Sequence, residues 1–261
     1  MHCRVCEFKL KFVKDIQGEV TGELIPLQKC SNCGSYFSCI DFTNQVINKL
    51  PDGEIDGYLN TKRDVKTRIN TLFSMLDADL FNGDNKKYLD IGCGVGWALM
   101  VAKEYGFEAC GVEPEVKAVK FARSELRLNV VNSYFSSDLF EHESFDLIVM
   151  DQVLEHLSNP LNFLVDAFKL LKPGGIFFLG VPPLDWSRKA ISISLHFSSN
   201  MINKIRKISY LKSIVPILDK YDLFISPEGH INYFTAKSIK ILAKECNAMV
   251  VGELYNNIAR A

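Results

Sequence analysis

The chain has 261 residues, a formal net charge of −1, 48% hydrophobic residues and 23% charged residues. These values fit one α/β domain with an appendage, and they exclude an overall positive field that would hold a polyanion. No stretch is long and apolar enough for a membrane span, and the start, Met1-His2-Cys3-Arg4-Val5-Cys6, lacks the apolar run of a secretory signal. We therefore expect a cytoplasmic protein whose cysteines stay reduced.

Residues 1–40 are predicted to be a zinc-binding module. Cys3-x-x-Cys6 and Cys30-x-x-Cys33 each supply two thiolates from one tight turn, and four thiolates complete the tetrahedral shell of a structural zinc ion. A segment this short buries too little apolar surface to fold by itself. We therefore expect metal binding to supply the free energy that folds it. The alternative, buried free thiols, is disfavoured because a chain terminus offers little core. The isolated Cys39, Cys93, Cys110 and Cys246 are interpreted as packing residues.

The later elements follow a strand–helix alternation. Phe8–Lys14 is a predicted strand, and residues 41–86 form a connector that ends in an amphipathic helix. Residues 87–261 are predicted to form a Rossmann-like, doubly wound, mostly parallel sheet with right-handed crossovers. The predicted strands are 88–91, 108–112, 128–131, 145–150, 176–181 and 249–251. The predicted helices are 97–105, one with Pro114 in its first turn, one around 161–171, and one from Thr235 to Cys246. An insertion, 184–226, looks helical.

The turn after the first of these strands is rich in glycine: Asp90-Ile91-Gly92-Cys93-Gly94-Val95-Gly96. Glycines let a backbone approach a ligand closely, although a tight turn without a ligand is the alternative. Glu113 ends the second strand, where a carboxylate can accept hydrogen bonds from both hydroxyls of a ribose. The G-x-G-x-G spacing differs from the G-x-G-x-x-G of pyrophosphate sites. Since the Asp90 carboxylate repels phosphate and attracts an amine or a sulfonium, charge favours S-adenosylmethionine over NAD.

Five segments together resemble the class I S-adenosylmethionine-dependent methyltransferases, especially the small-molecule branch of the ubiquinone-biosynthesis type. They are Leu89–Gly96, Gly111–Pro114, Phe145–Ile148, Val153–Leu157 and Leu171–Gly175. The resemblance implies a bound cofactor with Asp90, Gly92 and Gly94 along its methionine part, and with Cys93 in the same loop. It also implies that Glu113 contacts the ribose, and that Asp151 and Gln152 lie between cofactor and acceptor.

The chain departs from this family at two places. Many relatives carry an acidic residue after the third strand that meets the adenine amino group, whereas this chain reads Asn132-Ser133-Tyr134-Phe135. Asp138 or a backbone carbonyl would then take over that contact. Few residues follow the predicted last strand, which leaves little for the antiparallel strand that usually closes the sheet.

Candidate catalytic residues lie after the fourth strand and in Gly229–Phe234, a segment similar to a recurrent piece of this branch. His156 is a candidate general base, with a structural histidine at a helix start as the alternative. His230 is a second candidate, and Tyr58 and Tyr233 are weaker ones. Basic residues gather in the insertion, which we expect to cover the pocket; they fit an anionic acceptor or, alternatively, a solvated helix face. They are Arg188, Lys189, Lys204, Arg206, Lys207 and Lys212.

The leading hypothesis is methyl transfer to a small molecule, such as a sugar, a nucleotide-linked sugar or a surface-glycan precursor. The alternative is an RNA base methyltransferase that grips RNA with the zinc module, which is disfavoured because only scattered lysines surround the cysteines. Zinc modules also occur in sugar C-methyltransferases and rRNA guanine methyltransferases that resemble this chain, so the module does not select the acceptor. A scaffold without activity is a third hypothesis, disfavoured by the intact Asp90 loop and Glu113.

Overall fold

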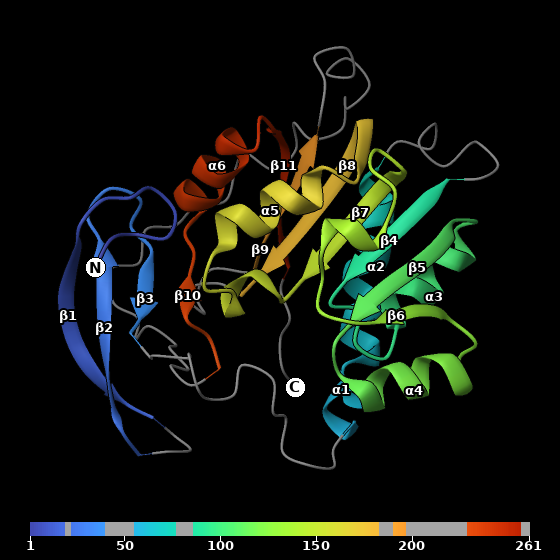
Figure 1. Cartoon of the computed structure of the whole chain (residues 1–261), viewed down its shortest axis with the longest axis horizontal. Coiled ribbons are helices and arrows are strands. Elements are labelled where there is room, and N and C mark those ends of the chain that lie inside the picture. Colours follow the sequence, from blue (N-terminus) through green and yellow to red (C-terminus); the bar gives the residue numbers. More distant parts are fainter. Residues whose placement is uncertain (19–21, 40–54, 77–85, 183–189, 197–228, 257–261) are drawn as a thin grey trace.

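A computed structural model of the chain describes residues 1–18, 22–39, 55–76, 86–182, 190–196 and 229–256. Its large sheet has the strand order β11-β9-β8-β7-β4-β5-β6, and a small sheet has the order β1-β2-β3-β10 (Figure 1). The helices of the described ranges are all too short or too polar to cross a membrane.

The large sheet is parallel from β6 to β8. Its strands are β4 (Lys87–Ile91), β5 (Glu108–Glu113), β6 (Asn129–Asn132), β7 (Phe145–Asp151), β8 (Leu171–Val181), β9 (Ala190–His196) and β11 (Met249–Asn256). The chain runs outward from β4 through β5 to β6, then crosses back to β7 on the other side of β4. The predicted Rossmann-like, doubly wound fold is confirmed. Such a reversal leaves a crevice at the carboxyl ends of the strands, where ligands bind.

Helices cover both faces of the large sheet (Figure 1). They are α1 (Asp56–Asn60), α2 (Lys62–Met75), α3 (Trp97–Glu104), α4 (Val116–Ser124), α5 (Pro160–Phe168) and α6 (Ala236–Glu245), with short 3₁₀ turns η2 (Ser137–Leu139) and η3 (Leu154–His156). Because side chains alternate along a strand, Leu89 and Ile148 pack with residues of α5 and α6. Tyr88 and Leu147 point the other way and pack with residues of α2 and α3.

The insertion was expected to be helical, but its described part, Ala190–His196, is strand β9. The letters ISIS alternate β-branched and small polar residues with a period of two, which favours a strand. β9 pairs antiparallel with both β8 and β11, so it supplies the antiparallel strand that the sequence seemed to lack.

Several predicted element ends also move. Pro114 precedes α4 and is not in its first turn, because Glu115 is the N-cap and accepts a hydrogen bond from the Lys117 amide. α5 ends at Phe168, and β8 begins at Leu171, where the predicted helix still continued. The helix predicted from Thr235 to Cys246 is α6 with its two cap residues, and Thr235 and Ser238 form a reciprocal capping box at its start.

The small sheet joins the N-terminal residues to a distant part of the chain. It contains β1 (Leu10–Gln17), β2 (Leu24–Cys30), β3 (Tyr36–Ser38) and β10 (Asn232–Tyr233). β10 pairs antiparallel with β3, with Asn232 opposite Phe37 and Tyr233 opposite Tyr36. The predicted module therefore shares its sheet with residues near α6. Its predicted end at residue 40, and part of the predicted connector 41–86, lie outside the described residues.

Candidate active site

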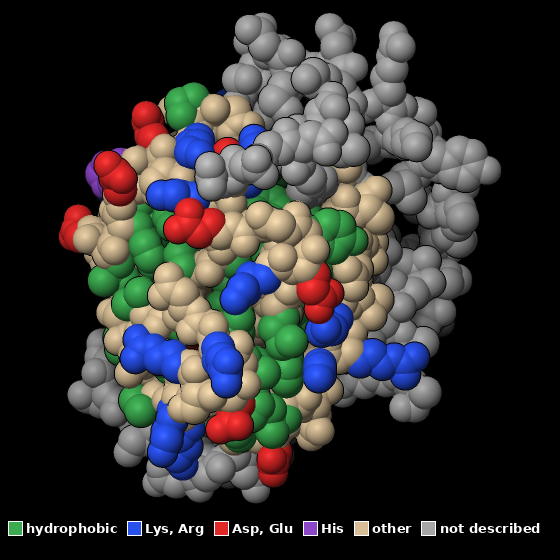
Figure 2. Space-filling view, turned by 90° about the vertical axis from the view of Figure 1, so that its right-hand side faces the viewer, with side chains coloured by type: hydrophobic (Ala, Val, Ile, Leu, Met, Phe, Trp, Pro, Cys, Tyr) green, Lys and Arg blue, Asp and Glu red, His purple; other side chains and the backbone are tan. Residues whose placement is uncertain are grey.

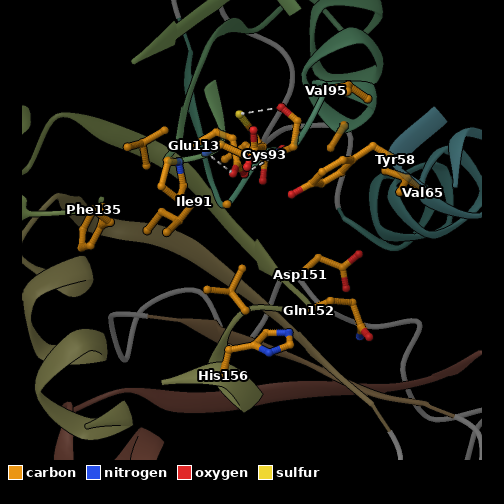
Figure 3. A pocket seen from close by; sticks show the side chains of 18 of the residues that line it. Tyr58, Val65, Ile91, Cys93, Val95, Glu113, Phe135, Asp151, Gln152 and His156 are labelled. Carbon is orange, nitrogen blue, oxygen red and sulfur yellow. Dashed lines mark hydrogen bonds between the residues drawn. The ribbon is translucent and has the colours of Figure 1, made fainter. Parts of the chain in front are cut away.

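A cavity of about 640 Å³ opens at the carboxyl ends of β4, β5 and β7. Figure 3 shows Glu113 and Cys93 on one side of it and Asp151, Gln152 and His156 on the opposite side. The predicted site residues that line it are Tyr58, Asp90, Gly92, Cys93, Gly94, Glu113, Asp151, Gln152 and His156. Residues predicted from four separate sequence segments are thus brought to one cavity.

The glycine-rich turn lies tightly between neighbouring side chains. Gly92 and Gly94 have φ angles of +77° and +52°, in the left-handed region that other residues rarely adopt. A methyl group on Gly92 would overlap the Val153 side chain, and one on Gly94 would lie 2.8 Å from the Tyr58 ring. Cys93 is buried, and burial raises the pKa of its thiol well above the ordinary value. The turn therefore offers backbone, and not reactive side chains, to a ligand.

The Glu113 carboxylate is fixed by two backbone amides at the end of β5. One oxygen accepts from the Gly94 N–H and the other from the Glu115 N–H, each at 2.9 Å. Burial raises the pKa of this carboxyl, while the two N–H donors act against that rise. Since each carboxylate oxygen has two lone pairs, both can still accept from a ligand hydroxyl.

The cavity wall carries more carboxyl groups than basic groups. Asp90, Glu113, Glu115 and Asp151 line it, with Arg68 as the guanidinium. Burial, followed by the charges of Asp151 and Glu113, raises the pKa of Asp90 well above its ordinary value. A cationic ligand relieves this repulsion between carboxylates, so the charge of the wall favours a cation.

Arg68 of α2 was missed by the sequence analysis. Its Nε and Nη2 both lie 2.7 Å from one carboxylate oxygen of Asp151. The other oxygen of Asp151 is buried and has no hydrogen-bond partner within the described ranges. One signal was available: Arg68 is three residues after Val65 and four before Leu72, so it is a charge on the apolar face of the predicted helix.

Two histidines meet beside the cavity. The rings of His156 and His230 have centroids 4.9 Å apart, and His156 Nδ1 contacts the Gly229 carbonyl oxygen. Burial lowers the pKa of His156, and burial together with His156 lowers that of His230 to about 4. Both rings are therefore neutral at pH 7. His156 lines the cavity, whereas His230 and Tyr233 lie behind it and are not among its lining residues.

Glu155 lies between these histidines and was also missed. One of its carboxylate oxygens is 4.0 Å from Nε2 of both His156 and His230. The side chain is wholly buried, and neither oxygen has a hydrogen-bond partner among the residues described. Burial raises its pKa to about 8. The acid directly precedes a candidate histidine in the sequence, which was the available signal.

This burial predicts a pH dependence of stability that depends on Glu155. A carboxyl whose pKa is raised to about 8 keeps its proton when folded, so the free energy of unfolding falls as pH rises from about 4.5 to 8. The lowered pKa of His230 acts in the opposite direction, but only below about pH 6.5. Between pH 6.5 and 8, Glu155→Gln should therefore lose less stability than wild type, by about 1–2 kcal/mol. Urea unfolding at several pH values measures this, and identical slopes for both proteins would contradict it.

The stretch after β6 contributes aromatic rings to the cavity. Tyr134 and Phe135 line it, and the Phe135 ring packs 5.0 Å from Phe163. Asp138, the acid considered for the adenine contact, lies in η2, is exposed and does not line the cavity. At this edge of the cavity, aromatic side chains therefore lie where an acidic residue was considered for the adenine contact.

The four N-terminal thiols come together as the spacing predicts. All four sulfur atoms lie within 4.8 Å of one another, and Cys3–Cys33 and Cys6–Cys30 are each 3.5 Å apart. Zinc–sulfur bonds of about 2.3 Å in a tetrahedron require sulfur separations of roughly 3.8 Å. The hydrogen bond between Cys3 and Cys33 lowers the pKa of the Cys33 thiol and raises that of Cys3, so that in this pair Cys33 is the thiolate. The donor set and its spacing fit zinc.

The chain was compared with known proteins. Residues 60–252 match the family model described as "Methyltransferase domain". The chain belongs to this methyltransferase family. Ubiquinone biosynthesis O-methyltransferases are among the relatives of this chain. The Agrobacterium fabrum protein is 27% identical over 65% of the chain and 63% of its own length, and the Rhizobium leguminosarum protein 22% identical over 59% of each. The match thus spans less than two thirds of these relatives.

Among solved structures, an S-adenosylmethionine-dependent methyltransferase from Archaeoglobus fulgidus is similar to this chain. It is 24% identical, and the likeness covers 50% of this chain and 59% of the other with a TM-score of 0.42.

Proposed function

We propose that the chain transfers a methyl group from S-adenosylmethionine to a small molecule. One observation carries this proposal: the Glu113 carboxylate is joined to the Gly94 amide at the edge of a cavity whose wall is rich in carboxyl groups. The two oxygens of the Glu113 carboxylate can accept hydrogen bonds from the two hydroxyls of a ribose. The carboxyl groups of the cavity wall attract the positively charged sulfonium and amine. Membership of the methyltransferase family supports the same conclusion.

The cavity suggests a place for each part of the cofactor. Asp90 and the turn Gly92-Cys93-Gly94 would contact the methionine part, and Glu113 would bind the ribose hydroxyls. Tyr134 and Phe135 would pack against the adenine, because an aromatic ring can stack on the flat face of any base. Asp151 and Gln152, which line the cavity, would lie between cofactor and acceptor.

The residues of this chain have two tasks in methyl transfer. When bound, the cofactor supplies a methyl group on a positively charged sulfur, which leaves as a neutral thioether. Asp151, held by Arg68, and Gln152 would align the acceptor with the methyl carbon. His156 would accept the acceptor's proton, because its lowered pKa keeps the imidazole neutral and able to act as a base.

The names of the relatives favour a hydroxyl acceptor, since they are called O-methyltransferases. A sugar, a nucleotide-linked sugar or a glycan precursor remains our hypothesis for its class. The basic residues on which an anionic acceptor was based, among them Arg188 and Lys204, lie outside the described residues. Comparing the methylation rates of phosphorylated and dephosphorylated acceptors tests whether the acceptor is anionic. Equal rates would contradict an anionic acceptor.

RNA as acceptor remains the weaker hypothesis. Strong RNA binding requires a continuous basic surface that releases counterions from the phosphates. On the face shown in Figure 2, lysines and arginines are interspersed with acidic and uncharged side chains. The described surface in this view therefore favours a small acceptor.

A screen with labelled methyl donor and candidate acceptors, analysed by mass spectrometry, tests the proposed function. We expect transfer of one methyl group to a small hydroxylated acceptor, and a slower rate with His156→Ala at unchanged affinity for S-adenosylhomocysteine. A chain that binds NAD and not S-adenosylhomocysteine in calorimetry would overturn the proposal.

We further propose that the four-cysteine cluster holds one structural zinc ion. Four thiolates fill a tetrahedral shell and leave no position for a substrate, so this ion would stabilise the module and take no part in methyl transfer. Metal analysis should give one zinc per chain, and Cys33→Ser should lower both zinc content and thermal stability. Cys246→Ser, which removes a buried thiol outside the cluster, is the matched control and should keep the zinc. Full zinc content in Cys33→Ser would contradict the assignment.

A further inference from the structure

Both cysteine knuckles contact the short segment that carries His230. Arg4, inside the first knuckle, donates from Nη1 to the Ile231 carbonyl at 3.1 Å and to the Asn232 side-chain oxygen at 3.0 Å. In the second knuckle, the Cys33 carbonyl accepts from the Thr235 hydroxyl at 2.7 Å. One segment, residues 230–235, is thus held by the two halves of the metal module.

Strand β3 adds further bonds to the same segment. The Ser38 amide donates to the Ile231 carbonyl at 3.2 Å, and the Ser38 hydroxyl donates to the His230 carbonyl at 3.1 Å. The guanidinium of Arg4 also lies 5.7 Å from the centre of the Phe37 ring, which is buried on β3. The backbone of His230 and Ile231 is therefore fixed from the side of the module.

The opposite side of this segment contacts η3, which carries Glu155 and His156. The Ile231 amide donates to the Glu155 carbonyl at 3.0 Å, and the Asn232 side-chain amide donates to the Leu157 carbonyl at 2.7 Å. Asn232 is 1% exposed, so Arg4 and the carbonyls of η3 satisfy its amide in a dry environment. A displacement of Asn232 would leave buried polar groups unpaired, which is costly.

We infer that the four-cysteine module positions His230 against Glu155 and His156, with Arg4 as the positioning residue. Arg4 lies between two ligand cysteines, so its direction is set by the fold of the first knuckle. The Arg4 guanidinium donates to the Asn232 side chain, and Asn232 donates to the carbonyl that follows η3. Two side chains, Arg4 and Asn232, therefore connect the cysteine module to the histidine pair. The part that the histidines play in methyl transfer rests on the proposed function, whereas the positioning itself does not.

Two substitutions in the 261-residue chain, prepared with zinc, test the inference. Arg4→Met removes the donors and keeps most of the apolar length, while Lys11→Met makes the same loss of charge at an exposed site on β1 of the same module. Amide hydrogen exchange at Ile231 and the imidazole resonances of His156 and His230 are measured by NMR. Zinc content and affinity for S-adenosylhomocysteine are measured in parallel.

Arg4→Met should accelerate exchange at Ile231 by roughly tenfold or more and shift the His230 resonances. Zinc content and affinity for S-adenosylhomocysteine should stay within twofold of wild type, which for the affinity corresponds to about 0.4 kcal/mol. Arg4→Lys should restore part of the protection, and Ser38→Ala should change it in the same direction as Arg4→Met but less. If Arg4→Met matches Lys11→Met at both Ile231 and His230, the inference is wrong. Failure of all variants to bind S-adenosylhomocysteine would contradict the proposed function alone, because the NMR readouts need no ligand.

Discussion

Replacing Gly92 by alanine is expected to abolish measurable binding of S-adenosylhomocysteine. The added methyl group would overlap the Val153 side chain, and the φ angle of +77° is unfavourable for any residue with a Cβ. The left-handed backbone costs about 1–2 kcal/mol, and overpacking costs roughly 1–3 kcal/mol more. Because the turn forms the floor of the cavity, this strain would be relieved by moving the backbone away from the ligand. Calorimetric titration measures the loss.

Gly106 is the matched control for this substitution. It also has a left-handed φ angle, +87°, but nothing lies within 4 Å of an added methyl group. Gly106→Ala should therefore lose a little stability and keep its affinity. Removing the overlap in the double variant Gly92→Ala/Val153→Ala should restore part of the binding. Wild-type affinity in Gly92→Ala alone would show that the turn does not contact the ligand.

Glu113→Ala should weaken binding of S-adenosylhomocysteine by about 1–3 kcal/mol, which is roughly a 5- to 150-fold rise in Kd. The substitution removes the acceptors proposed for the ribose hydroxyls and also releases the Gly94 and Glu115 amides. Glu113→Gln should be intermediate, since its amide keeps one oxygen acceptor.

The control for Glu113 lies on the same strand. Glu108 begins β5 and is exposed, so Glu108→Ala removes the same charge and side-chain length away from the cavity. Its affinity should equal that of wild type. An unchanged Kd in Glu113→Ala, measured on folded protein, would refute the assignment of the ribose contact.

The sequence predicted those parts of the structure that local patterns determine. The buried strands and the turn from Asp90 to Gly96 follow from short apolar runs and glycine spacing, and the start of α6 at Thr235 was predicted within one residue. The four cysteines also meet as predicted, because paired knuckles bring two thiolates each.

Contacts between distant segments were not predictable from one sequence. Arg68 reaches Asp151 only because α2 packs beside β7, and Glu155 acquires its environment only when His230 folds back onto η3. β9 was missed because the Ile and Ser alternation is short and lies within a Lys-rich insertion. The junction of β10 with β3 joins residues some two hundred positions apart in the chain, and no local pattern records such a pairing.

A crystal structure grown with S-adenosylhomocysteine tests the central claim most directly. We predict the nucleotide in the cavity between the turn at Gly92 and the rings of Tyr134 and Phe135, with its two ribose hydroxyls within hydrogen-bond distance of the Glu113 carboxylate. A ligand bound elsewhere, or a cavity that excludes S-adenosylhomocysteine and accepts NAD, would contradict it.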